Sequence, residues 1–166
     1  MDFNVGDRVV MQAHGVGQIA QIAEHNFNGR GPTWYYEVVT ARGTIWVAVN
    51  GSNTSGLRQL TDRADLARYR GLLQSQPAPV NADPLQRKSE MAQRLRQGSL
   101  QVICEVVRDL NALRWRRPLG EADSALLRRA QDGLAEEWAS AAGIPRAEAD
   151  QEINDLLQAA RSLYEQ

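Results

Sequence analysis

The sequence predicts an α+β protein of two domains, with a strongly bent antiparallel β-sheet or small barrel over residues 1–60 and an all-α bundle of about five helices over residues 61–166. Before residue 60, short runs of β-branched and aromatic residues lie between glycine-containing turns, which is typical of a small sheet. After residue 60, apolar residues recur at helical spacing between prolines and glycines. A length of 166 residues suits one domain or two small ones.

The first domain contains four predicted strands. They cover residues 8–11, 18–22, 34–39 and 44–49. Turn residues precede each of them, including Gly6-Asp7, Gly15-Val16-Gly17, the loop 28–32 and Arg42-Gly43. Short strands joined by such turns indicate antiparallel pairing. Because fewer than 60 residues form only a marginal core, we expect this domain to pack on another surface.

The second domain contains five predicted helices. They cover residues 64–74, 85–96, about 100–113, 122–142 and 146–164. Thr61-Asp62 can cap the first helix and Ser99 the third. Gly143 suits the position after the fourth helix, and Pro145 suits the first turn of the fifth. Residues 76–83 contain two prolines and no periodicity, so we expect this connector to be the most mobile segment.

The composition favours a globular cytoplasmic protein without a membrane partner. Hydrophobic residues make up 43% of the chain and charged residues 23%. No apolar run approaches the roughly 20 residues that cross a bilayer. The start of the chain also lacks the basic and apolar regions of a signal peptide.

No motif in the sequence predicts an enzyme active site. His14 and His25 lie in the strand half without further metal ligands at a suitable spacing. Cys104 falls on an apolar helix face with no histidine nearby in the helical half, so a buried inert thiol is expected. We therefore expect no catalysis, no cofactor, no metal and no small-molecule substrate.

The formal net charge of −1 hides an uneven distribution. Residues 84–117 carry eight basic and three acidic side chains, and residues 118–166 carry four basic and ten acidic side chains. The two segments thus have net charges of +5 and −6. Such asymmetry marks either a surface that binds a polyanion or two oppositely charged helical segments that pack together.

An ordered set of short motifs resembles the CarD/CdnL family of bacterial transcription regulators that bind RNA polymerase. In the strand half, the motifs are Phe3-Asn4-Val5-Gly6-Asp7-Arg8-Val9-Val10, His14-Gly15-Val16-Gly17, Val47-Ala48-Val49 and Gly56-Leu57-Arg58. In the helical half, they are Leu95-Arg96-Gln97-Gly98-Ser99, Val106-Val107-Arg108-Asp109-Leu110, Leu126-Leu127-Arg128-Arg129-Ala130 and Leu134-Ala135-Glu136-Glu137. Each motif alone is weak, but their common order covers nearly the whole chain.

This resemblance implies that residues 1–60 form a Tudor-like or SH3-like bent sheet. The family's sheet docks on the RNA polymerase β subunit, partly by edge-strand pairing. The candidate polymerase-binding residues here are Arg42, Trp46, Val47, Ala48 and Val49. Trp46 is alternatively a core aromatic, and Arg42 a plain turn residue. The family pattern Val-Pro-Val-Glu stands here as Val47-Ala48-Val49-Asn50.

The resemblance also implies that residues 61–166 contact promoter DNA near the upstream edge of the melted region. There, the family inserts a tryptophan wedge into the minor groove and stabilises the open complex. Here Pro84 holds the wedge position, with Leu85 beside it, and leucine and proline serve as wedges in other proteins. The candidate DNA-binding residues are Pro84, Leu85, Arg87, Lys88 and Arg94.

Two functions follow from this resemblance. In the first, the protein binds the polymerase and promoter DNA, is associated with the nucleoid through the polymerase, and modulates open-complex stability. In the second, it is a polymerase-bound protein-interaction adaptor without productive DNA contact. The absence of the wedge tryptophan motivates the second function. In that case the basic residues of segment 84–117 are solvated surface charges rather than DNA contacts.

Overall fold

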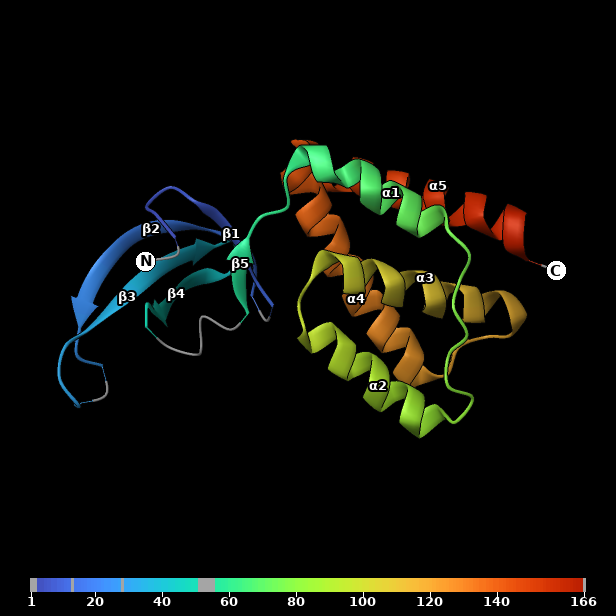
Figure 1. The fold of residues 1–166 in the computed structure, drawn as a ribbon, viewed down its shortest axis with the longest axis horizontal. Helices are drawn as coiled ribbons and strands as arrows, with labels where there is room; N and C mark the ends of the chain where they lie inside the picture. Colours follow the sequence, from blue (N-terminus) through green and yellow to red (C-terminus); the bar gives the residue numbers. More distant parts are fainter. Residues whose placement is uncertain (1–2, 13, 28, 51–55, 166) are drawn as a thin grey trace. The chain divides into compact units, whose positions relative to one another are not determined.

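The computed structural model describes residues 3–12, 14–27, 29–50 and 56–165, and the chain divides into two units, Met1–Leu60 and Thr61–Gln166 (Figure 1). The first unit is a five-stranded sheet and the second is a set of helices. This confirms the predicted α+β class, with a bent antiparallel sheet followed by a helical bundle.

Every strand of the sheet pairs antiparallel with its neighbours. The strands are β1 (Arg8–Met11), β2 (Gly15–His25), β3 (Thr33–Thr40), β4 (Gly43–Ala48) and β5 (Leu57–Gln59), in the order β4-β3-β2-β1-β5. The prediction missed β5, because three residues are too few to show an alternating pattern. It also shortened β2, whose 11 residues include a register shift between Ile19 and Gln21. Such an irregularity bends a strand and increases its twist.

One face of the sheet carries the core of this unit. Its buried members are Phe3, Val9, Ile19, Tyr36, Val38, Val47 and Leu57. Phe3 packs edge-on against Tyr36, and the Phe3 backbone N–H donates to the Tyr36 hydroxyl at 3.3 Å. Gly17 is required where β2 pairs with the end of β3. A Cβ at this position would lie 2.8 Å from Val38 Cγ1 and 2.9 Å from the Val39 carbonyl oxygen.

The helices of the second unit lie close to the predicted ranges. They are the 3-10 turn η2 (Arg63–Asp65), α1 (Leu66–Gln74), α2 (Pro84–Arg96), α3 (Leu100–Arg116), α4 (Glu121–Ala142) and α5 (Arg146–Tyr164). The predicted cap of α3 is present, since Ser99 Oγ accepts from the Val102 N–H at 3.1 Å. Gly143 follows α4 with a φ of 71°, as its predicted position requires. The predicted cap of the first helix is wrong, because Asp62 makes no capping bond with its side chain.

The bundle core draws buried residues from all five helices, and α2, which contributes Met91, packs on α3 and α4. Trp138 is fully buried within it, and Trp115 is half-buried. Glu137 is also buried, and its Oε2 accepts from both the hydroxyl and the N–H of Thr61. Within the part of the chain that the structure describes, no helix is both long enough and apolar enough for a bilayer span.

The connector between α1 and α2 is anchored along its length. The Ala78 N–H donates to Asp109 Oδ1 at 2.9 Å, and Arg87 Nη1 donates to the Asn81 carbonyl at 2.8 Å. Val80 packs against the bundle core. The expectation of high mobility for residues 76–83 considered only the prolines and the missing periodicity; these contacts with the helices argue against it, and the mobility itself stays a prediction.

Candidate protein and nucleic-acid interfaces

Strand β4 lies at one edge of the sheet, where it pairs with β3 alone among the described strands (Figure 1). The Val49 N–H, just after β4, donates to the Trp34 carbonyl in β3 at 2.9 Å. Backbone groups alternate in direction along an antiparallel strand. Ile45 and Val47 therefore bond with β3, whereas the N–H and C=O groups of Thr44, Trp46 and Ala48 point to the free edge.

This alternation divides the predicted polymerase-binding residues. Val47 is buried in the sheet core, and Val49 packs against that core. Their backbone groups bond with β3 rather than facing outward, so they offer no free N–H or C=O to a partner, and their assignment as contact residues stays a prediction. The prediction treated a strand motif as one unit, although its side chains and backbone groups alternate with a period of two. Trp46 and Ala48 remain at the free edge.

Trp46 belongs to an aromatic cluster on the face of the sheet opposite the core. Its ring lies 4.5 Å from that of His25 and 5.8 Å from that of Phe27, measured between centroids. Phe27 also stacks on His25 at 4.8 Å and contacts Tyr35 edge-on at 4.9 Å. Phe27 is 56% exposed, so the cluster leaves apolar surface in water. Trp46 is thus not a core aromatic, and the sequence pattern did not reveal its ring partners.

Arg42 lies in the two-residue turn between β3 and β4. Its side chain is exposed, and its backbone N–H donates to Thr40 Oγ1 at 3.1 Å. The same hydroxyl donates to the Gly43 carbonyl at 3.0 Å, which fixes the turn. Arg42 therefore precedes the edge strand β4 with an exposed side chain, and its role in binding the polymerase stays a prediction.

The first turn of α2 presents an apolar side chain to solvent. Pro84 is its first residue, where a missing N–H costs nothing and the fixed φ favours the helix. Leu85 follows and is 78% exposed, an unusual position for a leucine. Lys88 is also exposed. These three predicted DNA-binding residues therefore share one accessible helix start.

Arg87 does not share that surface, which disfavours the predicted contact of its side chain with DNA. Its side chain is buried, with Nη2 2.7 Å from Asp123 Oδ2 and Nε 3.2 Å from both Asp123 oxygens. The hydrogen bond with Asp123 raises the pKa of Arg87, which keeps its guanidinium protonated. The prediction followed the charge of segment 84–117, but a net charge does not reveal which cations already have partners.

Arg94 also has ion-pair partners within the protein, although its side chain is 33% exposed, and its assignment as a DNA contact stays a prediction. Its Nη2 lies 3.2 Å from Glu105 Oε1, and its Nη1 lies 3.9 Å from Asp109 Oδ2. Asp109 also binds Arg108 at 2.8 Å. Arg94 thus belongs to a network that joins α2 to α3.

The structure adds three arginines that the prediction had counted in the charge but had not assigned to a site. Arg114, Arg116 and Arg117 lie at the end of α3 and are exposed. In the part of the chain that the structure describes, none of the three forms an ion pair. The proline and glycine of the following turn could have signalled their exposure.

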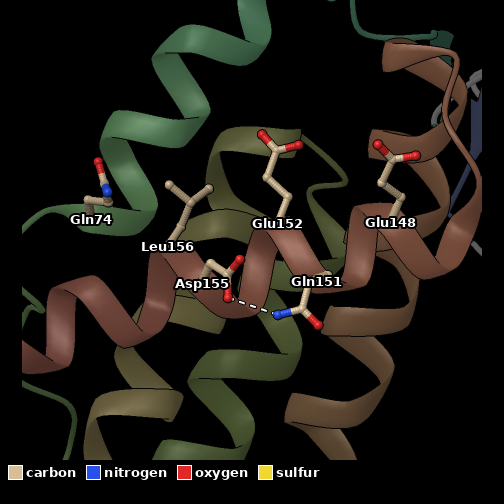
Figure 2. A pocket seen from close by; sticks show the side chains of 6 residues that line it. All are labelled: Gln74, Glu148, Gln151, Glu152, Asp155 and Leu156. Atoms are coloured by element: carbon tan, nitrogen blue, oxygen red, sulfur yellow. Dashed lines mark hydrogen bonds between the residues drawn. The ribbon is translucent and has the colours of Figure 1, made fainter.

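A surface pocket between α1 and α5 is lined by acidic rather than basic side chains. Its lining residues are Gln74, Glu148, Gln151, Glu152, Asp155 and Leu156 (Figure 2). Glu152 pairs with Arg70, and Gln151 donates to Asp155 at 2.8 Å. The net negative charge of this lining disfavours nucleic acid. The described residues contain no cluster of metal-ligating side chains.

Cys104 is a fully buried side chain in α3. Burial raises the pKa of its thiol to about 12, and the nearby carboxylates of Glu137 and Glu105 add to the effect. The thiol therefore stays protonated at neutral pH and is a poor nucleophile, as the sequence predicted.

Both units match models of known protein families. The family model described as "CarD-like/TRCF RID domain" matches residues 3–61, and "CarD, C-terminal domain" matches residues 70–154. The chain belongs to the CarD family. Among curated proteins, this CarD-family chain is 25% identical over 143 residues to "Putative transcription factor YdeB" of Bacillus subtilis (strain 168). The alignment covers 86% of the chain and 94% of that protein.

The predicted resemblance to CarD-like transcription regulators is thus confirmed. The polymerase-interacting (RID) match covers the sheet with the free β4 edge, and the C-terminal match covers α2, α3 and α4 completely. The proline of the CarD-family Val-Pro-Val-Glu pattern corresponds to Ala48, whose N–H points away from β3. A proline there removes no bond within the sheet, since prolines in sheets are confined to such edge positions.

Proposed function

We propose that this CarD-family chain binds the RNA polymerase β subunit through its sheet and contacts promoter DNA through its helical unit, thereby modulating the stability of the open complex. The observation that carries this proposal is the free β4 edge within the region that matches the polymerase-interacting domain. An extended segment of the β subunit can add a sixth strand there, because unpaired N–H and C=O groups offer a ready template.

The aromatic cluster supports the same docking surface. Trp46 supplies backbone groups at the free edge and a ring on the outer face of the sheet. A strand added beside β4 would place every second side chain next to Thr44, Trp46 and Ala48. Apolar and arginine side chains are favoured opposite Trp46, since both pack well on an indole ring. Exposed apolar surface of this kind marks interaction sites.

A pair of substitutions at Thr44 tests strand addition. Thr44→Pro removes an N–H that faces the free edge, and the preceding Gly43 tolerates the backbone restriction that proline imposes. Thr44→Val keeps the N–H and serves as the control. We expect Thr44→Pro to weaken binding of the full chain to purified β subunit at least tenfold, with Thr44→Val close to wild type. Equal affinities in a calorimetric titration would exclude pairing along β4.

The start of α2 supports DNA contact. Leu85 is exposed enough to enter a minor groove as a small wedge, and Lys88 lies one turn further on. We expect the full chain to prolong the lifetime of open promoter complexes and Leu85→Ala to abolish this effect. Leu85→Trp should strengthen it, because a larger ring unstacks a base step more effectively. An unchanged lifetime in all three cases would contradict DNA contact.

The second candidate is a polymerase-bound adaptor without productive DNA contact. The burial of Arg87 and the pairing of Arg94 favour it, because they remove two expected phosphate contacts. Binding to the β subunit without any change in open-complex lifetime would support the adaptor. The same lifetime assay therefore separates the two candidates.

A further inference from the structure

Glu37 lies in the middle of β3, on the face of the sheet opposite the core. Its neighbours along the strand, Tyr36 and Val38, are fully buried in the core, so the alternation of side chains puts Glu37 on the outer face. The Glu37 side chain is half-buried, and it forms no hydrogen bond or ion pair with a residue that the structure describes. Partial burial removes water from a carboxylate, and a paired cation would offset that cost.

Trp46 in β4 is the direct cross-strand neighbour of Glu37. The residues on either side of Trp46 exchange the hydrogen bonds with β3, so Trp46 and Glu37 form a non-hydrogen-bonded pair, in which side chains approach most closely. The ring of His25 lies edge-on to the indole, with 4.5 Å between the centroids, and holds it in place. An indole and a carboxylate thus occupy adjacent positions on the outer face.

The described residues around this pair on the outer face carry no charge. They are Gln21 on β2, Tyr35 and Val39 on β3, and Thr44 and Ala48 on β4. Strands β2, β3 and β4 contain no arginine or lysine. Arg8 and Arg58 belong to β1 and β5, at the other side of the sheet. The strands next to Glu37 therefore supply no basic side chain to its carboxylate.

A strand added at the free edge of β4 would extend the row that contains Glu37 and Trp46. Because neighbouring strands lie about 4.8 Å apart, a residue opposite Trp46 on the added strand has its Cα roughly 10 Å from that of Glu37. An arginine or lysine side chain can cross the indole at this distance and meet the carboxylate. The indole attracts a cation over its face, and the carboxylate accepts charge-assisted hydrogen bonds from it.

Other occupants of this position fit less well. An apolar side chain would remove more water from the Glu37 carboxylate without giving it a partner, and an acidic side chain would be repelled. The same carboxylate disfavours a phosphate-rich surface, so a protein segment is favoured over nucleic acid. Only a long basic side chain satisfies both Trp46 and Glu37.

We propose that Trp46 and Glu37 together recognise an arginine or lysine side chain on the β-subunit segment that pairs with β4. This inference rests on the proposed function and deepens it, because it names the class of residue that the docking segment carries opposite Trp46. The free backbone groups of β4 can pair with any extended segment, whereas the indole and the carboxylate select a basic one. Strand pairing thus supplies affinity, and this pair supplies specificity.

The test is the affinity of full-chain variants for the purified β subunit, measured by calorimetric titration. Glu37→Gln keeps the size of the side chain and removes its charge, and Glu37→Lys reverses the charge. Glu24→Gln and Glu24→Lys are the matched controls, since they change the net charge of the sheet unit equally. Glu24 is exposed on β2, and its cross-strand partner is Trp34 rather than Trp46.

We expect Glu37→Gln to weaken binding about tenfold and Glu37→Lys about a hundredfold, with both Glu24 variants within about twofold of wild type. The direction of the change identifies the facing residue. If that residue is apolar, Glu37→Gln strengthens binding, because a desolvated charge is removed. If it is acidic, Glu37→Lys strengthens binding. Either result, or an unchanged affinity of Glu37→Gln, overturns the proposal.

A substitution at Trp46 tests whether both groups bind the same cation. Trp46→Leu keeps apolar surface and removes the aromatic face. We expect Trp46→Leu to weaken binding, and the double variant Glu37→Gln/Trp46→Leu to lose less than the product of the two single losses, because both act on one side chain. Losses that multiply fully would assign Trp46 and Glu37 to separate contacts and refute joint recognition.

The outcome is separable from that of the proposed function. If Thr44→Pro weakens binding while Glu37→Gln does not, strand pairing stands and recognition of a basic residue fails. If the unsubstituted chain does not bind the β subunit, both fail. Circular dichroism of the Glu37 and Glu24 variants should match wild type, because neither side chain belongs to the core of the sheet unit. A loss of sheet signal confined to Glu37→Lys leaves Glu37→Gln as the deciding comparison.

Discussion

The burial of a single arginine changes how the basic segment is understood. Arg87 lies in the segment with the highest positive charge, yet its guanidinium joins α2 to Asp123 in α4 and to the Asn81 carbonyl in the connector. Because the Arg87 guanidinium already binds these two partners, it could bind a DNA phosphate only by leaving the Asp123 carboxylate buried and unpaired. Its role is to position the first turn of α2, and with it Leu85.

Removing one partner of this pair should destabilise the protein strongly. Arg87→Met leaves the Asp123 carboxylate buried without its cation, which costs about 3–5 kcal/mol. The double variant Arg87→Met/Asp123→Leu should be more stable than Arg87→Met, because it leaves no buried charge. Lys88→Met, at an exposed neighbouring site, should change the free energy of unfolding by no more than about 0.5 kcal/mol. Urea unfolding measures all three, and a stability of Arg87→Met equal to that of Lys88→Met would contradict this role.

The Cys104 thiol should resist modification in the folded protein. Because burial raises its pKa to about 12, the thiolate fraction stays small from neutral pH to about pH 10. An aromatic disulfide reagent at pH 8 should react only after addition of denaturant. Rapid reaction of the native protein would mean that α3 opens locally or that the thiol is accessible.

At the scale of elements, partners far away in sequence decide how segments behave. The connector before α2 has no helical pattern, but its backbone bonds to Asp109 and Arg87. Asp109 is itself buried and held by Arg108. The start of α2 is therefore presented by a fixed connector rather than by a free linker.

Hydrogen exchange can check this anchoring. The Ala78 amide should exchange slowly, because it donates to buried Asp109. Asp109→Leu should accelerate exchange at Ala78 by at least tenfold, since the amide then loses its acceptor. Amides of the β-sheet unit provide the internal control and should not change. Fast exchange at Ala78 in the wild-type protein would show that the connector opens readily.

Strand β4 illustrates the same dependence on neighbours. Its apolar and aromatic residues predicted a strand, and that prediction is confirmed for Gly43–Ala48. Whether a strand lies inside a sheet or at its edge depends on the order β4-β3-β2-β1-β5, which local residues do not encode. The side chains of Val47 and Val49 lie on the core side of this edge strand, whereas Trp46 and Ala48 lie on the opposite face.

The whole molecule consists of two units whose boundary lies between adjacent residues. The Leu60 N–H donates to the Arg8 carbonyl within the sheet unit, and Thr61 bonds to Glu137 within the helical unit. The helical unit has its own core, formed by residues of all five helices. We therefore expect each unit to unfold in its own transition, with the smaller sheet unit less stable.

A fragment spanning residues 61–166 should fold without the sheet. It should unfold cooperatively in urea, with a midpoint close to that of the helical signal of the full chain. The matching fragment of residues 1–60 should be less stable, because a domain of this size buries a small core. A fragment 61–166 that lacks helical circular dichroism would contradict this division.

The amino-acid sequence by itself determined the order of strands and helices, most of their boundaries, the family and the uneven charge. These properties depend on residues that are close together in the chain: alternation for strands, helical spacing for α1 to α5, and glycine, proline or serine at the ends. Only the tertiary structure decided which cations are paired, which strand is an edge and which side chains are exposed. Arg87 and Arg117 have the same charge, but one meets Asp123 across the bundle while the other faces water. Such pairing depends on residues brought together by folding, and a linear pattern does not contain it.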